Sequence, residues 1–163
     1  MQTRNEISED ITRRYAERSI LIDEIKPAAP GIRALATLAA WLIPGAGHLV
    51  LGRYGRAVLF FVIITGSFAL GLALHGHLYW PTLAEPQSSF FRYDLITVLW
   101  FFAQIGSGLC YIVPYLLGLG ATPIAEAATF PTFEYGNTFM FLAGLLNYLV
   151  IHDAFDIAAG RKR

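Results

Sequence analysis

The sequence has almost none of the residues that could crosslink it or bind a metal through sulfur. Cys110 is the single cysteine among 163 residues, so an intramolecular disulfide and a site built from several thiolates are both excluded. The thiol lies inside an apolar run, where we expect it to be buried and inert. An excess of charge of one sign is also missing, because twelve basic and twelve acidic residues cancel. We therefore expect no nucleic acid among its partners.

Charge is missing altogether from long stretches of the chain. No charged residue occurs from Ala57 to Leu74 or from Leu95 to Gly120, and runs of this length match the hydrocarbon thickness of a bilayer. In lipid, only helices and closed barrels satisfy their own backbone hydrogen bonds. The sequence therefore predicts an all-α, multi-pass membrane protein with four transmembrane helices. The expected spans are residues 32–51, 57–75, 93–119 and 136–158, within a transmembrane domain of residues 32–163.

Residues 1–31 form a polar arm that ends in a Pro/Gly linker. Ile7, Ile11 and Tyr15 recur at four-residue spacing, which places them on one face of an amphipathic helix. That helix is either solvated or docks on a partner protein. We expect no cleavable secretory signal, because these residues are charged throughout and lack the necessary apolar stretch.

The first and third spans contain helix breakers. Pro44, Gly45 and Gly47 interrupt the first span near its far end, and in lipid such a break persists only where neighbouring groups bind the freed carbonyls. Pro114 predicts a kink or tilt in the third span.

The positions of lysine and arginine predict the orientation of the chain. Four crossings with both termini in the cytoplasm place seven of these residues on the inner side and two, Arg53 and Arg56, outside. A rival arrangement with a re-entrant first segment keeps Arg53 and Arg56 inside but exports the C-terminus, and gives five against four. The count favours the first arrangement, in the inner (cytoplasmic) membrane.

Four crossings would bring several titratable residues to the inner side, with Asp94 among them. The candidate metal ligands are His75, His77, His152, Asp153 and Asp156. Imidazole and carboxylate groups together suit a divalent metal or a proton relay. The alternative is that they anchor helix ends and pair with nearby arginines, so we commit to no metal site and expect no cofactor.

Two amides, Gln104 and Asn147, are the notable polar side chains deeper in the spans. Each either hydrogen-bonds neighbouring helices or lines a polar path. No charged residue lies at the centre of any span, which argues against an ion-coupled transporter. The glycines around Gly45 lack the strand and the Gly-Lys-Ser/Thr of a phosphate loop, and no zinc-protease motif is present.

The first hairpin and three later segments carry the sequence motifs on which a resemblance to known families rests. The hairpin residues are Pro44, Gly45, Gly47, His48, Gly52 and Arg53, and the later segments are residues 134–138, 144–147 and 153–161. Over residues 33–162 the chain resembles an uncharacterised bacterial family of small four-span membrane proteins with a domain of unknown function. The hairpin alone is more distantly similar to the two-transmembrane-helix domain family. Neither resemblance implies a catalytic residue or a substrate.

The leading hypothesis is a non-enzymatic membrane scaffold or accessory subunit. Its partners would be the lipid bilayer and a membrane protein or a second copy of the chain. The alternative is a carrier or channel for a small solute or metal ion. That alternative would use the broken first helix as a path and the His/Asp group as an inner gate.

Overall fold

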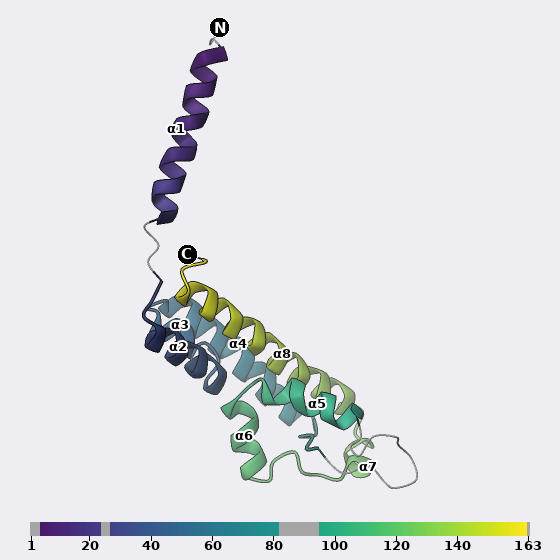
Figure 1. The fold of residues 1–163 in the computed structure, drawn as a ribbon. Coiled ribbons are helices and arrows are strands. Elements are labelled where there is room, and N and C mark those ends of the chain that lie inside the picture. The colour runs from purple at the N-terminus through teal and green to yellow at the C-terminus, as the bar shows by residue number, and fades with distance from the viewer. Residues whose placement is uncertain (1–3, 24–26, 82–94, 163) are drawn as a thin grey trace.

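The structure is a computed structural model that describes residues 4–23, 27–81 and 95–162. Within these ranges helices are the only regular elements, and Figure 1 shows their arrangement. They are α1 (Arg4–Asp23), α2 (Pro30–Leu42), α3 (Ala46–Val50), α4 (Tyr54–Ala73), α5 (Leu95–Ile105), α6 (Leu109–Leu116), α7 (Ile124–Ala127) and α8 (Phe133–Ala158). The predicted all-α class is confirmed for the described part of the chain.

Two helices, α4 and α8, are each long and apolar enough to cross a membrane. The bent pair α5 and α6 meets the same criterion only when the two are joined, so the described residues hold two candidate spans or up to three. Helix α2 has 13 residues, which cover about 20 Å of the roughly 30 Å hydrocarbon core. The apolar helices suggest a membrane protein, but the four crossings predicted from the sequence are not confirmed.

The break in the first segment lies where the sequence predicted it. Helix α2 ends at Leu42, and Gly45 has the positive φ of +82° that opens α3. A Cβ atom at Gly45 would overlap the carbonyl oxygen of Ala57 in α4. The turn therefore needs glycine for its backbone conformation and for its close approach to the next helix.

The third segment bends at a different place from the one predicted. Helices α5 and α6 meet at an angle of 114°, across residues 106–108. Pro114, where the sequence predicted a kink or tilt, lies further along the chain, inside α6. The reversal needs a residue with positive φ, which Gly108 supplies at +61°, whereas proline is fixed at negative φ.

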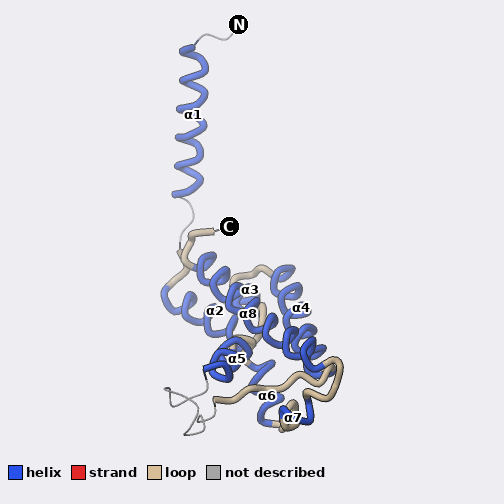
Figure 2. Tube along the Cα trace, turned by 90° about the vertical axis from the view of Figure 1, so that its right-hand side faces the viewer, coloured by secondary structure: helices blue, strands red, loops and turns tan. Residues whose placement is uncertain are grey.

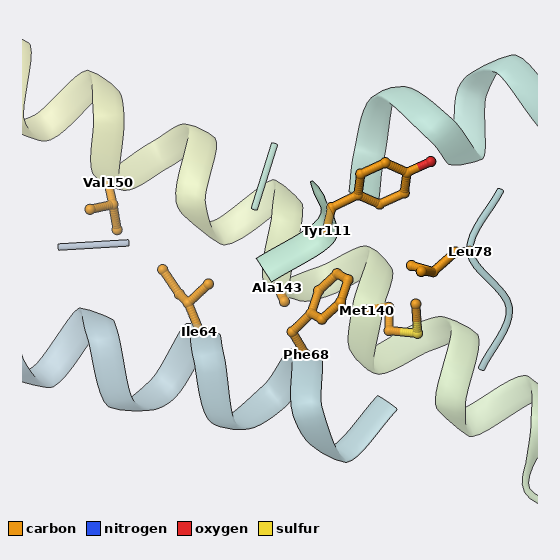
Figure 3. Packing of buried hydrophobic residues seen from close by; sticks show 7 residues of the cluster. All are labelled: Ile64, Phe68, Leu78, Tyr111, Met140, Ala143 and Val150. Carbon is orange, nitrogen blue, oxygen red and sulfur yellow. The ribbon is translucent and has the colours of Figure 1, made fainter. Parts of the chain in front are cut away.

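Helices α4 and α8 form the centre of the bundle, and their buried side chains face one another in Figure 3. Small residues of α4 lie at this contact. Ser67 donates a hydrogen bond to the carbonyl oxygen of Phe139 at 3.2 Å, and a Cβ at Gly71 would lie 2.7 Å from the carbonyl oxygen of Gly136. Close backbone approach of this kind is typical of helix contacts in membranes.

The two central helices run antiparallel. Gly71, near the end of α4, contacts Gly136 at the start of α8, whereas Arg56 at the start of α4 lies near Asp153 at the end of α8. The backbone N–H of Ala28 donates to the carbonyl oxygen of Ala158 at 2.9 Å. The starts of α2 and α4 therefore share one end of the bundle with the end of α8.

Helix α1 extends away from the bundle in both views of the chain (Figures 1 and 2). Ile7, Ile11 and Tyr15 are all exposed along it. The predicted helical arm is therefore present over residues 4–23, with these three apolar residues uncovered.

Candidate functional site

The histidines and carboxylates that the sequence groups on one side are divided between the two ends of the bundle. Two of the five, His75 and His77, follow α4 and lie beside the start of α8. The other three are His152, Asp153 and Asp156. These lie in the last turns of α8, about 30 Å further along its axis. The grouping was wrong because it required α4 and α8 to run parallel, and they are antiparallel.

The described residues also offer no alternative metal site. In residues 4–23, 27–81 and 95–162, no three His, Cys, Asp or Glu side chains are close enough to hold a metal ion together. Asp94 lies outside these ranges.

The two histidines after α4 are held by local contacts. Nδ1 of His75 lies 3.3 Å from Oγ1 of Thr132, and its ring stacks on Phe130 with centroids 3.9 Å apart. Nδ1 of His77 donates to the carbonyl oxygen of Thr122 at 3.0 Å. Burial lowers the pKa of His77 below its usual value, and the hydrogen bond to Thr122 opposes this shift in part. Both rings fasten the loop after α4 to the segment before α8.

At the opposite end, His48 forms a contact that the sequence did not predict. Its ring is fully buried, and Nε2 lies 3.0 Å from Oδ2 of Asp153. A carboxylate accepts hydrogen bonds, so Nε2 is the donor. The ring also lies 5.0 Å from that of Phe60, and its buried Nδ1 has no hydrogen-bond partner among the described residues. The contact pins the first hairpin to α8.

Basic side chains surround the two carboxylates at this end of the bundle. Nζ of Lys162 lies 3.0 Å from Oδ1 of Asp153 and 3.6 Å from Oδ2 of Asp156. Arg56 lies 3.9 Å from Asp153, and Arg161 lies 3.4 Å from Asp156. The hydrogen bond to Asp153 raises the pKa of Lys162. The carboxylates act here as anchors of helix ends, which was the alternative to a metal site.

Gln104 supports the irregular segment that follows α4. Its side chain is fully buried. Its Nε2 donates to the carbonyl oxygen of His77 at 2.9 Å, and its Oε1 accepts from the N–H of Tyr79 at 3.0 Å. The amide thus pairs with a backbone that has no helical partners. Of the two roles considered for Gln104, the structural one describes these contacts.

Two further residues, which the sequence does not single out, complete this support. Oδ1 of Asn137 accepts from the N–H of His77 at 2.9 Å, and the hydroxyl of Tyr111 donates to the carbonyl oxygen of Tyr79 at 2.6 Å. Asn137 lies in the recurrent segment 134–138, and its position beside an apolar span was the available signal. Nothing in the local sequence shows that these side chains meet the segment after α4.

Asn147 joins the two broken segments at the middle of α8. Its Nδ2 donates to the carbonyl oxygens of Ala40 at 3.1 Å and Gly106 at 2.8 Å. In a continuous helix, Ala40 would accept from the residue four positions later, but that residue is Pro44, which has no N–H. Trp41 adds a second link, because its indole N–H donates to the carbonyl oxygen of Ile105 at 3.2 Å. The freed carbonyls are thus bound by neighbours, as a break in lipid requires.

The remaining residues of the hairpin pattern have packing or turn roles. Pro44 is fully buried at the break. A Cβ at Gly47 would lie 2.7 Å from that of Ala40 and 3.0 Å from that of Ala154, which explains the glycine next to His48. Gly52 has φ +72° with open space around it, and Arg53 directly precedes α4.

An apolar groove runs along α4 and α8 toward the charged end. It encloses about 500 Å³ and ends at His152, Asp153 and Lys162.

One comparison with known proteins gives a match. A family model described as "family of unknown function (DUF6677)" matches residues 35–163. The chain belongs to this family. The match begins inside α2, covers all the helices from α3 to α8, and leaves α1 outside. No curated protein and no solved structure matches the chain.

Proposed function

We propose that this protein is a multi-pass inner-membrane protein that serves as a non-enzymatic scaffold or accessory subunit. One observation carries the proposal: two amides inside the bundle hydrogen-bond to the backbone of neighbouring segments. Gln104 and Asn147 are both fully buried, and each donates to main-chain carbonyls. Side chains used in this way hold helices together and do not line a polar path.

The proposed membrane topology has two full crossings, α4 and α8, and two re-entrant segments. Since α4 and α8 run antiparallel, the chain between them leaves and returns on one side, which supports a turn within the membrane at residues 106–108. The start of α2 and the start of α4 also share one end of the bundle. This supports a second turn at residues 43–45. Irregular backbone at membrane depth is tolerated where protein buries it.

The distribution of basic residues supports an orientation with both termini in the cytoplasm. Five basic residues lie at the end of the bundle where α8 finishes: Arg33, Arg53, Arg56, Arg161 and Lys162. Residues 74–81 and 117–132, at the other end, contain no lysine or arginine. Cytoplasmic sides of membrane proteins are enriched in these residues. The count of lysine and arginine over four crossings disfavoured a re-entrant first segment, because that arrangement exported the C-terminus. A second re-entrant segment keeps the C-terminus inside, so the re-entrant first segment gains support.

Helix α1 is the element best placed to bind a partner. It extends from the cytoplasmic end of the bundle, and Ile7, Ile11 and Tyr15 are exposed on it at four-residue spacing. An uncovered apolar stripe on an amphipathic helix fits into a groove on another protein.

Co-purification tests the scaffold proposal. The full chain, isolated in mild detergent after crosslinking in cells, is expected to carry a stoichiometric protein partner. Changing Ile7 and Ile11 to Asp should remove that partner, whereas changing Glu9 and Arg13 to Ala on other parts of α1 should not. Recovery of the chain alone, or equal loss with both pairs, contradicts the proposal.

A carrier or channel is the second candidate, favoured by the meeting of the two breaks near the middle of α8. Oδ1 of Asn147 is buried there without a hydrogen-bond partner among the described residues. Broken helices mark substrate sites in transporters. Solute uptake into proteoliposomes that Asn147→Ala abolishes, with unchanged protein recovery, would favour this function over the scaffold.

A further inference from the structure

A groove lined by α4 and α8 is apolar over most of its length and charged at one end. Its apolar lining is Phe60, Ile63, Ile64, Leu146, Leu149 and Val150. The charged end is formed by His152, Asp153 and Lys162, in the last turns of α8 and just after it. The described residues thus form a narrow amphipathic site of about 500 Å³.

Cations exceed carboxylates at this end. Two carboxylates, Asp153 and Asp156, lie here among three basic side chains. Arg56 is within 4 Å of Asp153, Arg161 is within 4 Å of Asp156, and Lys162 is within 4 Å of both. Lys162 and Arg56 keep 53% and 48% of their side chains exposed. Asp153 also accepts a hydrogen bond from buried His48, which holds the carboxylate in place beside both cations. The exposed cations are therefore held in place and face solvent or a ligand.

We propose that this groove binds one anionic phospholipid of the cytoplasmic leaflet. An acyl chain lies along the apolar lining, and the phosphate contacts Lys162 and Arg56. The inference rests on the membrane orientation proposed above, which puts these cations at the level of the inner-leaflet headgroups. Juxtamembrane basic residues attract the anionic lipids of that leaflet. Charge complementarity favours this occupant over a second protein helix, because an apolar helix face would leave the charged end unmatched.

Lipid titration by native mass spectrometry tests the proposal. The full chain in mild detergent receives increasing phosphatidylglycerol or, separately, phosphatidylcholine with the same acyl chains. We expect phosphatidylglycerol to bind at lower concentration. Arg56→Gln and Lys162→Gln should each weaken phosphatidylglycerol binding about fivefold and leave phosphatidylcholine unchanged. Lys162→Arg should restore binding, and Ile63→Trp, which fills the groove, should weaken both lipids.

Arg53→Gln is the matched control, since Arg53 lies at the same end of the bundle but does not line the groove and, unlike Arg56 and Lys162, has no ion pair with Asp153 among the described residues. An equal loss in this variant would assign the effect to general surface charge and overturn the site. Displacement of the lipid by soluble glycerol phosphate would also overturn it, because a simple anion site would then explain the binding.

Two further results would count against the proposal. Equal affinity for phosphatidylglycerol and phosphatidylcholine would show that Lys162 and Arg56 do not select an anionic headgroup. A dimer that Ile63→Trp abolishes, without lipid selectivity, assigns the groove to a second copy of the chain. Neither result removes the partner expected on α1, which co-purification tests separately.

Discussion

At the scale of single residues, side-chain amides replace the backbone hydrogen bonds that the broken helices lose. Asn147 binds one carbonyl from each broken segment, Ala40 and Gly106. Gln104 pairs with both a carbonyl and an N–H of the segment after α4. The sequence identified both amides as structural candidates from their depth in apolar runs. Their partners could not be identified, because those partners lie 25 to 107 positions away.

Replacing Asn147 by Leu tests this role. Two buried carbonyls lose their donor, and each unsatisfied group costs about 1–3 kcal/mol. We expect a clearly lower thermal unfolding midpoint in detergent. The exposed residue Leu149, half a turn away, provides the control: Leu149→Ala should change the midpoint far less. Equal stability of Asn147→Leu and the parent chain would show that Asn147 is not the link between the segments.

The pH dependence of stability tests the environment of His77. Burial lowers its pKa in the folded chain, so the unfolded chain takes up the proton first as pH falls below about 6.5. The free energy of unfolding should then decrease between that pH and the lower folded-state pKa. His77→Gln should flatten this part of the curve of midpoint against pH. A curve of the same slope in both proteins would assign the titration to another group.

At the scale of elements, the two breaks have different causes. In the first segment, Pro44 removes a donor and Gly45 supplies the turn, and both features are readable in the sequence. In the third segment, the sequence contains a more conspicuous breaker, Pro114, at the wrong place. A proline is tolerated when the helix bends or neighbours adjust around it. The reversal instead occurs at Gly106–Gly108, where the backbone contacts another segment closely.

Gly108→Ala tests that contact against backbone strain alone. A Cβ at Gly108 would overlap the carbonyl oxygen of Trp41 and lie 2.7 Å from that of Leu42. We expect loss of folded protein or a large drop in the unfolding midpoint. Gly118→Ala is the matched control, since Gly118 has φ +71° but open space around it, and it should cost only about 1 kcal/mol. Similar effects of both variants would contradict a steric role for Gly108.

At the scale of the whole molecule, the relative direction of α4 and α8 decides which residues meet. Counting apolar runs predicts four crossings and places the ends of α4 and α8 on the same side. Antiparallel packing of these helices instead puts Arg56 beside Asp153. The antiparallel packing separates the candidate metal ligands between the two ends of the bundle. It also brings the described basic residues of the bundle together at one end.

Cysteine labelling distinguishes the two proposed topologies. In a Cys110→Ser background, single cysteines replace Tyr54 and Trp80, which are both exposed. With two re-entrant segments, a membrane-impermeant maleimide should label Trp80→Cys in intact spheroplasts and Tyr54→Cys only after lysis. Four crossings give the opposite pattern. Cys110→Ser alone provides the background signal.

The sequence by itself determined the helical class, the apolar segments, the break at Pro44 and the polar arm. These follow from composition and from local backbone chemistry, which act over a few residues. Only the tertiary structure decided that the third segment turns at Gly106–Gly108, that His48 meets Asp153, and that the histidines after α4 lie far from the end of α8. The physical reason is that lipid requires every segment to satisfy its backbone, and distant neighbours such as Asn147 can do so. A short segment can therefore enter and return where its length alone suggested a crossing.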